Sequence, residues 1–185
     1  SGGFADFYSC NFNNADPFDC DHAVLTGSAT KNTGWVTLSS GTSVNGQLVF
    51  TIPTTGVESI TKITVSAQMY FGNEGQADAF GVVAGAATGH NPCTDVSATA
   101  LGVCVDVYND RAQAVRSGAT ATSSYSISQQ QNDDDFFHTL NAVFDYTGGS
   151  IATFTWASNT FSGQSFAFTP TVSQNNVVNF MSWSG

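Results

Sequence analysis

The sequence predicts an all-β fold, built as an antiparallel β-sandwich, jelly roll or barrel. Only 10% of the 185 residues are charged, whereas glycine and phenylalanine occur 18 and 15 times. Segments that alternate apolar and polar residues recur between clusters of glycine, asparagine and serine, and helical periodicity is missing from the sequence. About nine strands need two layers, because one sheet that wide would leave an apolar face in water. We expect one such domain over residues 1–185.

Four strands are expected in the first half of the chain: Gly34–Ser39, Gln47–Ile52, Ile63–Phe71 and Ala79–Gly85. The third shows the alternation most clearly. Its odd-numbered residues are all apolar, and its even-numbered residues are threonine, serine, glutamine and tyrosine. Successive side chains of a strand point to opposite faces, so this segment predicts one face for a core and one for water.

Five more strands are expected in the second half: Gly102–Tyr108, His138–Tyr146, Ile151–Trp156, Gln164–Pro170 and Asn176–Trp183. The turn signal Thr147–Gly149 lies between the second and third of these and predicts a hairpin. The polar stretch Arg116–Asp135 predicts a weak strand followed by a long surface loop.

The charge balance excludes two classes of partner. Four lysines and arginines stand against 14 aspartates and glutamates, which gives a net charge of −10. A chain of that charge is repelled by phosphate backbones and by anionic lipid surfaces, so nucleic acid is not expected as a partner. The sequence also lacks an apolar run of about 20 residues, so membrane insertion is not expected.

The four cysteines form two local pairs, Cys10 with Cys20 and Cys93 with Cys104. Each pair encloses a short polar segment that a disulfide could close, which favours an oxidising compartment and a secreted or cell-surface protein. Free thiols or a zinc site are the alternatives. Neither pair has the two-residue spacing of a zinc knuckle, however, and no histidine lies at ligand spacing.

The carboxylates do not identify an enzyme. Glycosidases need two carboxyl groups about 5 to 10 Å apart. The only glutamates, Glu58 and Glu74, flank one strand and are expected at opposite ends of it, about 30 Å apart. Aspartate pairs such as Asp78 with Asp106 stay open. A polysaccharide lyase or glycosidase is therefore kept as an alternative function.

One cluster of oxygen-bearing residues suits calcium. Asp106, Tyr108, Asn109 and Asp110 follow one another at the end of the expected strand Gly102–Tyr108. Calcium takes carboxylates, side-chain amides and backbone carbonyls together, so these four residues are candidate metal ligands. The alternative is an ordinary Asx turn, in which Asn109 and Asp110 bind their own backbone without an ion.

The order of the segments resembles the L-type lectins, the legume lectin-like group with the concanavalin A-like jelly roll. "NGQLVFTIP" is similar to a strand of that family that runs into a proline, and "QADAFGVVAG" is similar to its Ala-Asp-Gly-Phe-Ala-Phe-Val segment. "LGVCVDVYND", "FFHTLNAVFDYTGGSIATFTW" and "VVNFMSWSG" resemble later strands of the family, in the same order. The resemblance implies two packed antiparallel sheets and a shallow sugar site at one end of the curved front sheet.

The resemblance also implies roles for individual residues. Asp78 would accept hydrogen bonds from two sugar hydroxyls, and Gly85 or Gly89 would direct a backbone N–H at the sugar. Asp106 would bind calcium, Tyr108 would offer its carbonyl or stack on the sugar, and Asp110 or Asn109 would bridge ion and sugar. Cys104 stands where the family has a glutamate, so manganese is not expected.

The resulting expectation is a secreted, non-catalytic protein that binds glycans or polysaccharides, with calcium as a possible aid and oligomers allowed. An adhesion or surface domain that keeps the sandwich without sugar affinity is a further alternative.

Overall fold

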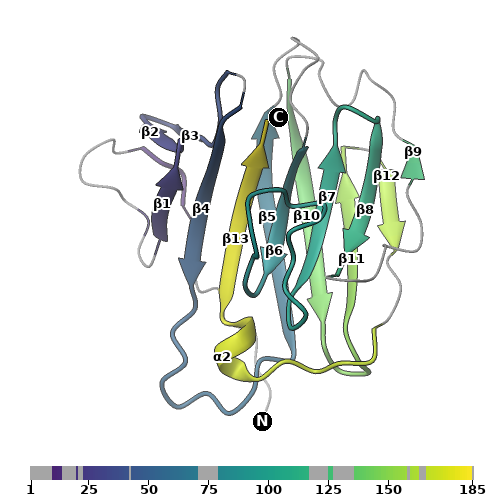
Figure 1. Ribbon diagram of the computed structural model, residues 1–185. Helices are drawn as coiled ribbons and strands as arrows, with labels where there is room; N and C mark the ends of the chain where they lie inside the picture. The colour runs from purple at the N-terminus through teal and green to yellow at the C-terminus, as the bar shows by residue number, and fades with distance from the viewer. Residues whose placement is uncertain are drawn as a thin grey trace.

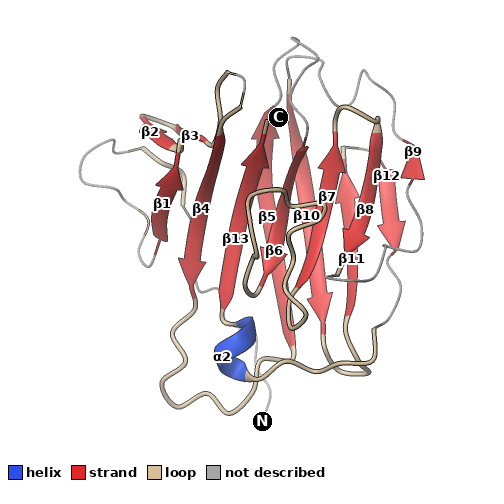
Figure 2. Ribbon diagram, in the orientation of Figure 1, coloured by secondary structure: helices blue, strands red, loops and turns tan. Residues whose placement is uncertain are grey.

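Two antiparallel β-sheets lie against each other in a computed structural model of the chain (Figure 1). The structure describes residues 10–13, 20, 23–41, 43–70, 79–116, 125–126, 136–157, 159–162 and 166–184. Strands account for most of these residues, and a short helix lies at one end of the sheets (Figure 2). The predicted antiparallel β-sandwich is confirmed.

The larger sheet has seven strands in the spatial order β1, β4, β13, β6, β7, β8, β9. In that order they are Ala23–Gly27, Asn45–Thr51, Val177–Trp183, Ala79–Ala84, Leu101–Asp106, Arg111–Val115 and Tyr125–Ser126. Every neighbouring pair is antiparallel. The last strand in sequence, β13, therefore lies inside the sheet, between β4 and β6.

The smaller sheet has four strands in the order β12, β11, β10, β5. They are Asn159–Ser162, Ile151–Trp156, Phe137–Asp145 and Lys62–Tyr70. A separate short hairpin joins β2 (Thr30–Asn32) to β3 (Trp35–Thr37), and helix α2 (Val172–Asn175) precedes β13. Among the described residues, no helix has the length and apolar character needed to span a membrane.

The main core lies between the two sheets. Trp156 of β11 is 0% exposed, and its ring centroid lies 4.9 Å from that of Phe80 of β6 in an edge-on arrangement. Strand β5 alternates as predicted, with Ile63 and Val65 buried and the residues between them exposed. Aromatic side chains supply large apolar areas, so contacts of the Trp156–Phe80 kind hold the sheets together.

Strands β6 and β7 are buried along their whole length because both of their faces are covered. Their inward residues join the core between the sheets, whereas their outward residues lie under the loop 85–100 that connects the two strands. Val96 and Ala100 of this loop form a second apolar cluster with Val83 and Cys104. The loop thus covers part of the outer face of the larger sheet.

Two features hold the loop close to the sheet. A disulfide joins Cys93 in the loop to Cys104 in β7. Gly81 permits the approach, because a Cβ atom at this position would overlap the Val103 carbonyl oxygen and would lie only 3.0 Å from the Pro92 side chain. Both predicted disulfides are present, the other being Cys10–Cys20.

Eight of the nine predicted strands are present, and β1, β2, β8 and β12 are additional to them. The segment Gln164–Pro170 is not a strand in its described part, where only Phe166 forms a bridge, to Ser150. The chain turns directly afterwards, since the Phe168 N–H donates to the Phe166 carbonyl at 2.9 Å. The expected absence of helix is wrong for the four residues of α2. Most of the predicted loop 116–135 lies outside the described residues.

The predicted hairpin after β10 is confirmed, since Asp145 is the register partner of Ile151. The Asp145 carboxylate accepts hydrogen bonds from the backbone N–H and the hydroxyl of Thr147, at 3.0 and 2.6 Å. These bonds, together with Lys62 at 3.7 Å, lower the pKa of Asp145 below its ordinary value of 3.8. The carboxylate therefore stabilises the turn in its ionised form.

We predict a pH-dependent loss of stability for Asp145→Ala. A carboxyl group whose pKa is lowered on folding contributes stability above its ordinary pKa and loses that contribution as the pH falls through the folded value. The variant should melt below the parent at neutral pH, and the difference should shrink below pH 3.8. Thermal melts across this range test it. A gap that stays constant with pH would contradict the role given to the ionised form.

Candidate functional site

One row of residues across the larger sheet organises the candidate site. Trp183 of β13 is the register partner of Ala79 in β6, Ala79 of Asp106 in β7, and Asp106 of Arg111 in β8. Ala79 is the smallest side chain of the row and stands between an indole and a carboxylate. The surface of the sheet is therefore lowest at Ala79, because the side chains on both sides of it are larger.

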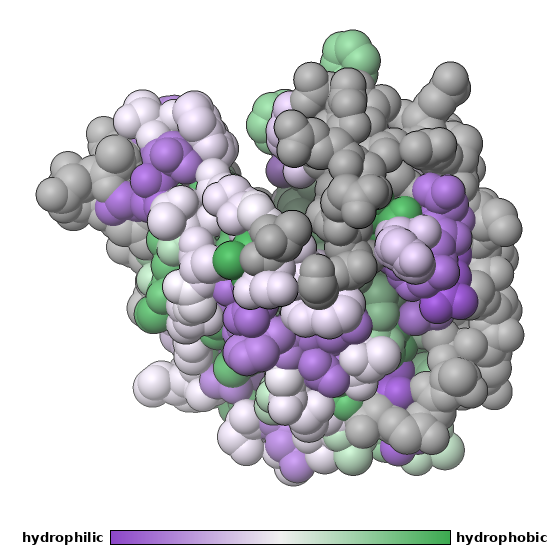
Figure 3. Space-filling view, turned by 45° about the horizontal axis from the view of Figure 1, so that its top comes forward, coloured by the Kyte–Doolittle hydropathy of each residue, from purple (hydrophilic) through white to green (hydrophobic). Residues whose placement is uncertain are grey.

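A hollow of about 310 Å³ opens over this row. The described residues that line it are Ala79, Asn91, Cys93, Thr94, Asp106, Tyr108, Asn109, Arg111, Gln113 and Trp183. They come from three neighbouring strands and β13, from the β7–β8 turn and from the loop that covers the sheet. With the top of the molecule turned forward, the visible face carries hydrophilic patches interrupted by small apolar areas (Figure 3).

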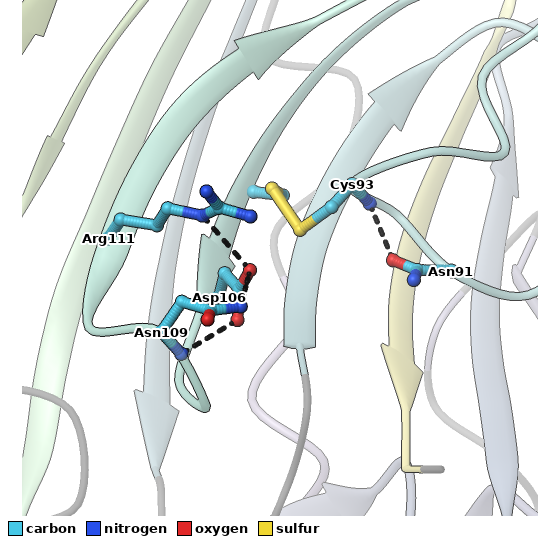
Figure 4. A network of polar contacts seen from close by, with 6 residues as sticks. Asn91, Cys93, Asp106, Asn109 and Arg111 are labelled. Carbon is cyan, nitrogen blue, oxygen red and sulfur yellow. Dashed lines mark hydrogen bonds and ion pairs between the residues drawn. A yellow bond between two sulfur atoms is a disulfide. The ribbon is translucent and has the colours of Figure 1, made fainter. Parts of the chain in front are cut away.

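Asp106 is the most buried charged group of the hollow, with 8% of its surface exposed. Its Oδ1 accepts the backbone N–H of Asn109 at 3.0 Å, and its Oδ2 accepts the Asn109 amide at 2.8 Å. Arg111 donates from Nε to the same Oδ2 at 3.2 Å. Arg111 and Asn109 converge on the carboxylate beside the Cys93 disulfide (Figure 4). A buried carboxylate requires this kind of compensation.

The rim on the loop side is shaped by Asp95. Its Oδ2 accepts the backbone N–H groups of His90 and Asn91 at 2.9 and 2.8 Å. A Cβ atom at Gly89 would lie 2.5 Å from this carboxylate oxygen, so glycine is needed where the loop wraps around Asp95. Asn91 in turn accepts the Cys93 N–H at 2.9 Å through its Oδ1. The rim is therefore fixed by local hydrogen bonds.

The hollow combines flat apolar surface with paired donors and acceptors. Tyr108 is 70% exposed, and Trp183 lies at the opposite end of the row from Arg111. Amides of Asn91, Asn109 and Gln113 also line the hollow. Among the described lining residues, Asp106 and Arg111 are the only charged groups, and their charges cancel. The arrangement suits an uncharged ligand rich in hydroxyl groups.

The predicted site residues are distributed unevenly around the hollow. Asp106, Tyr108 and Asn109 line it, and Asp110 follows them in a left-handed backbone conformation with φ 50°. Asp78 lies outside the described residues, although Ala79 beside it in sequence lines the hollow. The structure does not bring Gly85 or Gly89 into the lining, and the Gly85 N–H donates to the Val177 carbonyl at 2.8 Å.

Six lining residues were not predicted from the sequence: Trp183, Arg111, Asn91, Gln113, Ala79 and Thr94. Two of them carried a usable signal. Trp183 ends an alternating strand on the face opposite to the buried core, and Arg111 is the first residue after the acidic turn. Nothing in the sequence marks Asn91 or Gln113, because their place depends on the loop fold and the strand register.

The residues around Asp106 do not fit a calcium ion in the arrangement described. A ligand oxygen must offer a lone pair at about 2.3–2.6 Å. Both Asp106 oxygens already accept protein donors, and one of these donors is the Arg111 cation. No group of three or more histidine, cysteine, aspartate or glutamate side chains that could hold a metal occurs in the described part of the chain.

Comparisons with known proteins bear on the fold. No protein-family model matches the chain, and a comparison with curated protein sequences found no match. Solved structures of other proteins do match the fold of this chain. The carbohydrate recognition domain of Emp47p superposes with a TM-score of 0.65 at 13% identity, covering 100% of this chain and 91% of that domain.

Two further structures match as well. A lectin from Bauhinia forficata in complex with GalNAc has a TM-score of 0.65 at 12% identity, covering 98% of this chain and 92% of the lectin. The calcium-bound exoplasmic/lumenal domain of VIP36 has a TM-score of 0.64 at 8% identity, covering 98% and 86%. Matching structures also include metal-free forms. The chain therefore has the legume lectin-like β-sandwich fold, and the predicted resemblance to L-type lectins is confirmed as a remote one.

Proposed function

We propose that the chain is a carbohydrate-binding protein that holds an uncharged glycan in the hollow above Ala79. The observation that carries the proposal is the composition of the hollow. Two aromatic side chains, Trp183 and Tyr108, border a set of amides and one charge-compensated carboxylate. The fold supports the proposal, since the matching structures are named as lectins and carbohydrate recognition domains.

The aromatic groups supply the apolar part of recognition. A sugar ring has one face of C–H groups, which packs against an indole or phenol ring and removes apolar surface from water. Trp183 is held in the centre of the sheet by pairing on both sides, with Asn45 and Ala79. Its backbone is therefore fixed by the sheet, whereas Tyr108 lies in the turn and is mostly exposed.

The polar groups supply orientation. An ionised carboxylate only accepts hydrogen bonds, whereas side-chain amides both donate and accept them. Together these groups suit sugar hydroxyls, which also donate and accept hydrogen bonds. Asp78 stays a predicted glycan ligand, as the resemblance to L-type lectins implies. Gly89 stays a prediction as a glycan ligand, whereas the Gly85 N–H already donates to the Val177 carbonyl.

Neutral glycans are favoured over anionic ones. The two charges of the described lining cancel, and the chain carries a net charge of −10, which repels sulfated or uronate-rich polymers at long range. The two disulfides support a secreted protein, since such bonds persist in oxidising compartments. The predicted calcium assistance through Asp106, Tyr108, Asn109 and Asp110 is not part of this proposal, because Asn109 and Arg111 already donate to Asp106.

The enzyme alternative has less support. Two-carboxylate chemistry needs a second acid facing the first across the sugar. Asp106 is the only carboxylate among the described lining residues, and it is paired with Arg111. Incubation of the protein with a polysaccharide panel and analysis for released products would decide this point.

The test is a glycan array followed by calorimetry on the best ligand, with Trp183→Ala, Asp78→Ala and Trp35→Ala beside the parent. Truncating an aromatic anchor in a binding site typically weakens binding by more than about 1 kcal/mol, or roughly fivefold. Trp183→Ala and Asp78→Ala should reach that loss. Trp35→Ala is the matched control, because Trp35 lies on β3 and is 51% exposed.

Three results would contradict the proposal. The parent chain binding no glycan on the array would end it. Unchanged affinity in both Trp183→Ala and Asp78→Ala would place the glycan elsewhere. Stronger binding to sulfated or uronate-rich glycans than to neutral ones would contradict the charge argument.

A further inference from the structure

We propose that the guanidinium of Arg111 takes the place of a bound cation at Asp106, so that the β7–β8 turn and the hollow keep their shape without a divalent metal. The inference rests on the proposed function in one respect, that this hollow is where a glycan binds. Its structural part concerns only the charge balance at Asp106 and stands independently of any ligand.

Protein donors already occupy three of the roughly four lone-pair sites of the Asp106 carboxylate. Three protein donors approach the two Asp106 oxygens at 2.8 to 3.2 Å. These are the contacts that would fix a carboxylate around an ion, and here they come from Asn109 and Arg111. A divalent ion added beside Arg111 would face a positive charge at close range and would have to displace hydrogen bonds already made.

Arg111 lies directly opposite Asp106 in the sheet. It is the direct register partner of Asp106 in the β7–β8 pair, and the two residues are joined by a turn of four residues. Asp110, the last residue of that turn, has φ 50°, and its N–H donates to the Val107 carbonyl at 3.4 Å. The turn thus reverses the direction of the chain, so that Arg111 faces the Asp106 carboxylate across the strand pair.

The described residues beside the Asp106–Arg111 pair on the outer face of β7 and β8 are uncharged. Cys104 shares the outer face of β7 with Asp106, and it is closed in a disulfide with Cys93. The outer face of β8 next to it carries Gln113, the register partner of Cys104. The described residues of these two strands therefore offer one carboxylate and one cation on this face, which is a neutral pair rather than an acidic metal cage.

The consequence is a defined response to the loss of Arg111. The Asp106 carboxylate is 8% exposed, so removing its partner leaves a largely buried negative charge with neutral donors only. Any cation that reaches this carboxylate would stabilise the folded protein. The Arg111→Gln variant should therefore respond to calcium, whereas the parent should not.

The experiment compares melting temperatures in EDTA and in millimolar calcium chloride for the parent, Arg111→Gln and Lys62→Gln. The parent should melt at the same temperature in both. Arg111→Gln should melt lower than the parent in EDTA, by about 3 °C for a chain of this size, and should recover part of the loss in calcium. Lys62→Gln is the matched control, because it breaks an exposed ion pair with Asp145 in the other sheet and should not respond to calcium.

Two results would overturn the proposal. A parent that melts higher in calcium than in EDTA would show that a metal is needed despite Arg111. An Arg111→Gln variant that calcium does not stabilise would leave Arg111 as an ordinary structural ion pair.

Glycan binding by the parent in EDTA gives an additional readout that separates the two proposals. Binding that disappears in EDTA overturns the inference alone. Absence of any glycan binding, with the melting pattern as expected, contradicts the proposed function and leaves the Arg111 assignment intact. The parent measurements decide the inference even if Arg111→Gln does not fold.

Discussion

Trp156→Ala is expected to lower the free energy of unfolding by about 3–5 kcal/mol, the range for emptying a buried aromatic position. Trp156 is fully buried, meets Phe80 of the opposite sheet at 4.9 Å and has the His138 ring 5.5 Å away. Alanine would leave a cavity at the contact that joins the sheets. Urea denaturation followed by circular dichroism measures the loss.

Two further variants serve as controls for this experiment. Trp156→Phe keeps an aromatic ring and should lose less than the alanine variant. Trp35→Ala, at an exposed position, should stay within about 0.5 kcal/mol of the parent. Equal stabilities of Trp35→Ala and Trp156→Ala would mean that the sheets do not pack through Trp156.

Removing the Cys93–Cys104 disulfide is expected to reduce both stability and glycan affinity. The two cysteines are 11 residues apart, and the chain-entropy model gives a loss of about 3 kcal/mol for a loop of that length. The disulfide also holds Asn91, Cys93 and Thr94 at the rim of the hollow. The double variant Cys93→Ala/Cys104→Ala should therefore unfold at lower urea and bind glycan more weakly.

The matched control is Cys10→Ala/Cys20→Ala. Its cysteines are 10 residues apart, so the loss of stability should be similar, but neither cysteine lines the hollow. Its glycan affinity at a temperature where it remains folded should equal that of the parent. Parent-like binding by the Cys93→Ala/Cys104→Ala variant would contradict the role of the disulfide in shaping the rim.

The strands with strict alternation could be predicted because alternation records which residues face the core. In β5, Ile63 and Val65 are buried and the intervening residues are exposed, as period-2 patterning requires. The apolar runs of β6 and β7 were also recognisable as strands. Their complete burial was not, since it depends on a loop that folds back over the outer face.

The wrong strand at Gln164–Pro170 shows the limit of local pattern. Phe166 and Phe168 have strand-like spacing, and Phe166 does pair with Ser150. The hydrogen bond from the Phe168 N–H back to Phe166 ends the pairing after one residue. Whether an alternating segment finds a neighbour along its length is decided by the sheet as a whole, which a single sequence does not reveal.

The candidate site could be predicted only where its residues are close together in the sequence. The acidic turn after β7 was found because Asp106, Tyr108 and Asn109 are close in sequence. Trp183 and Arg111 reach the hollow through register with Ala79 and Asp106, and register is set by several strands together. The pairing of Arg111 with Asp106 then changes the chemistry expected of that carboxylate.

The methyl group of Ala79 has an implication for how such a molecule could acquire or lose its ligand. The available space depends on one short side chain between an indole and an acid, not on any of the polar groups themselves. Ala79 is only 2% exposed and belongs to the outer apolar cluster that includes Cys93 and Met181, so a single base change that lengthened it would fill the recess only by displacing buried neighbours. An evolutionary change of ligand size at this position would therefore lower the stability of the fold.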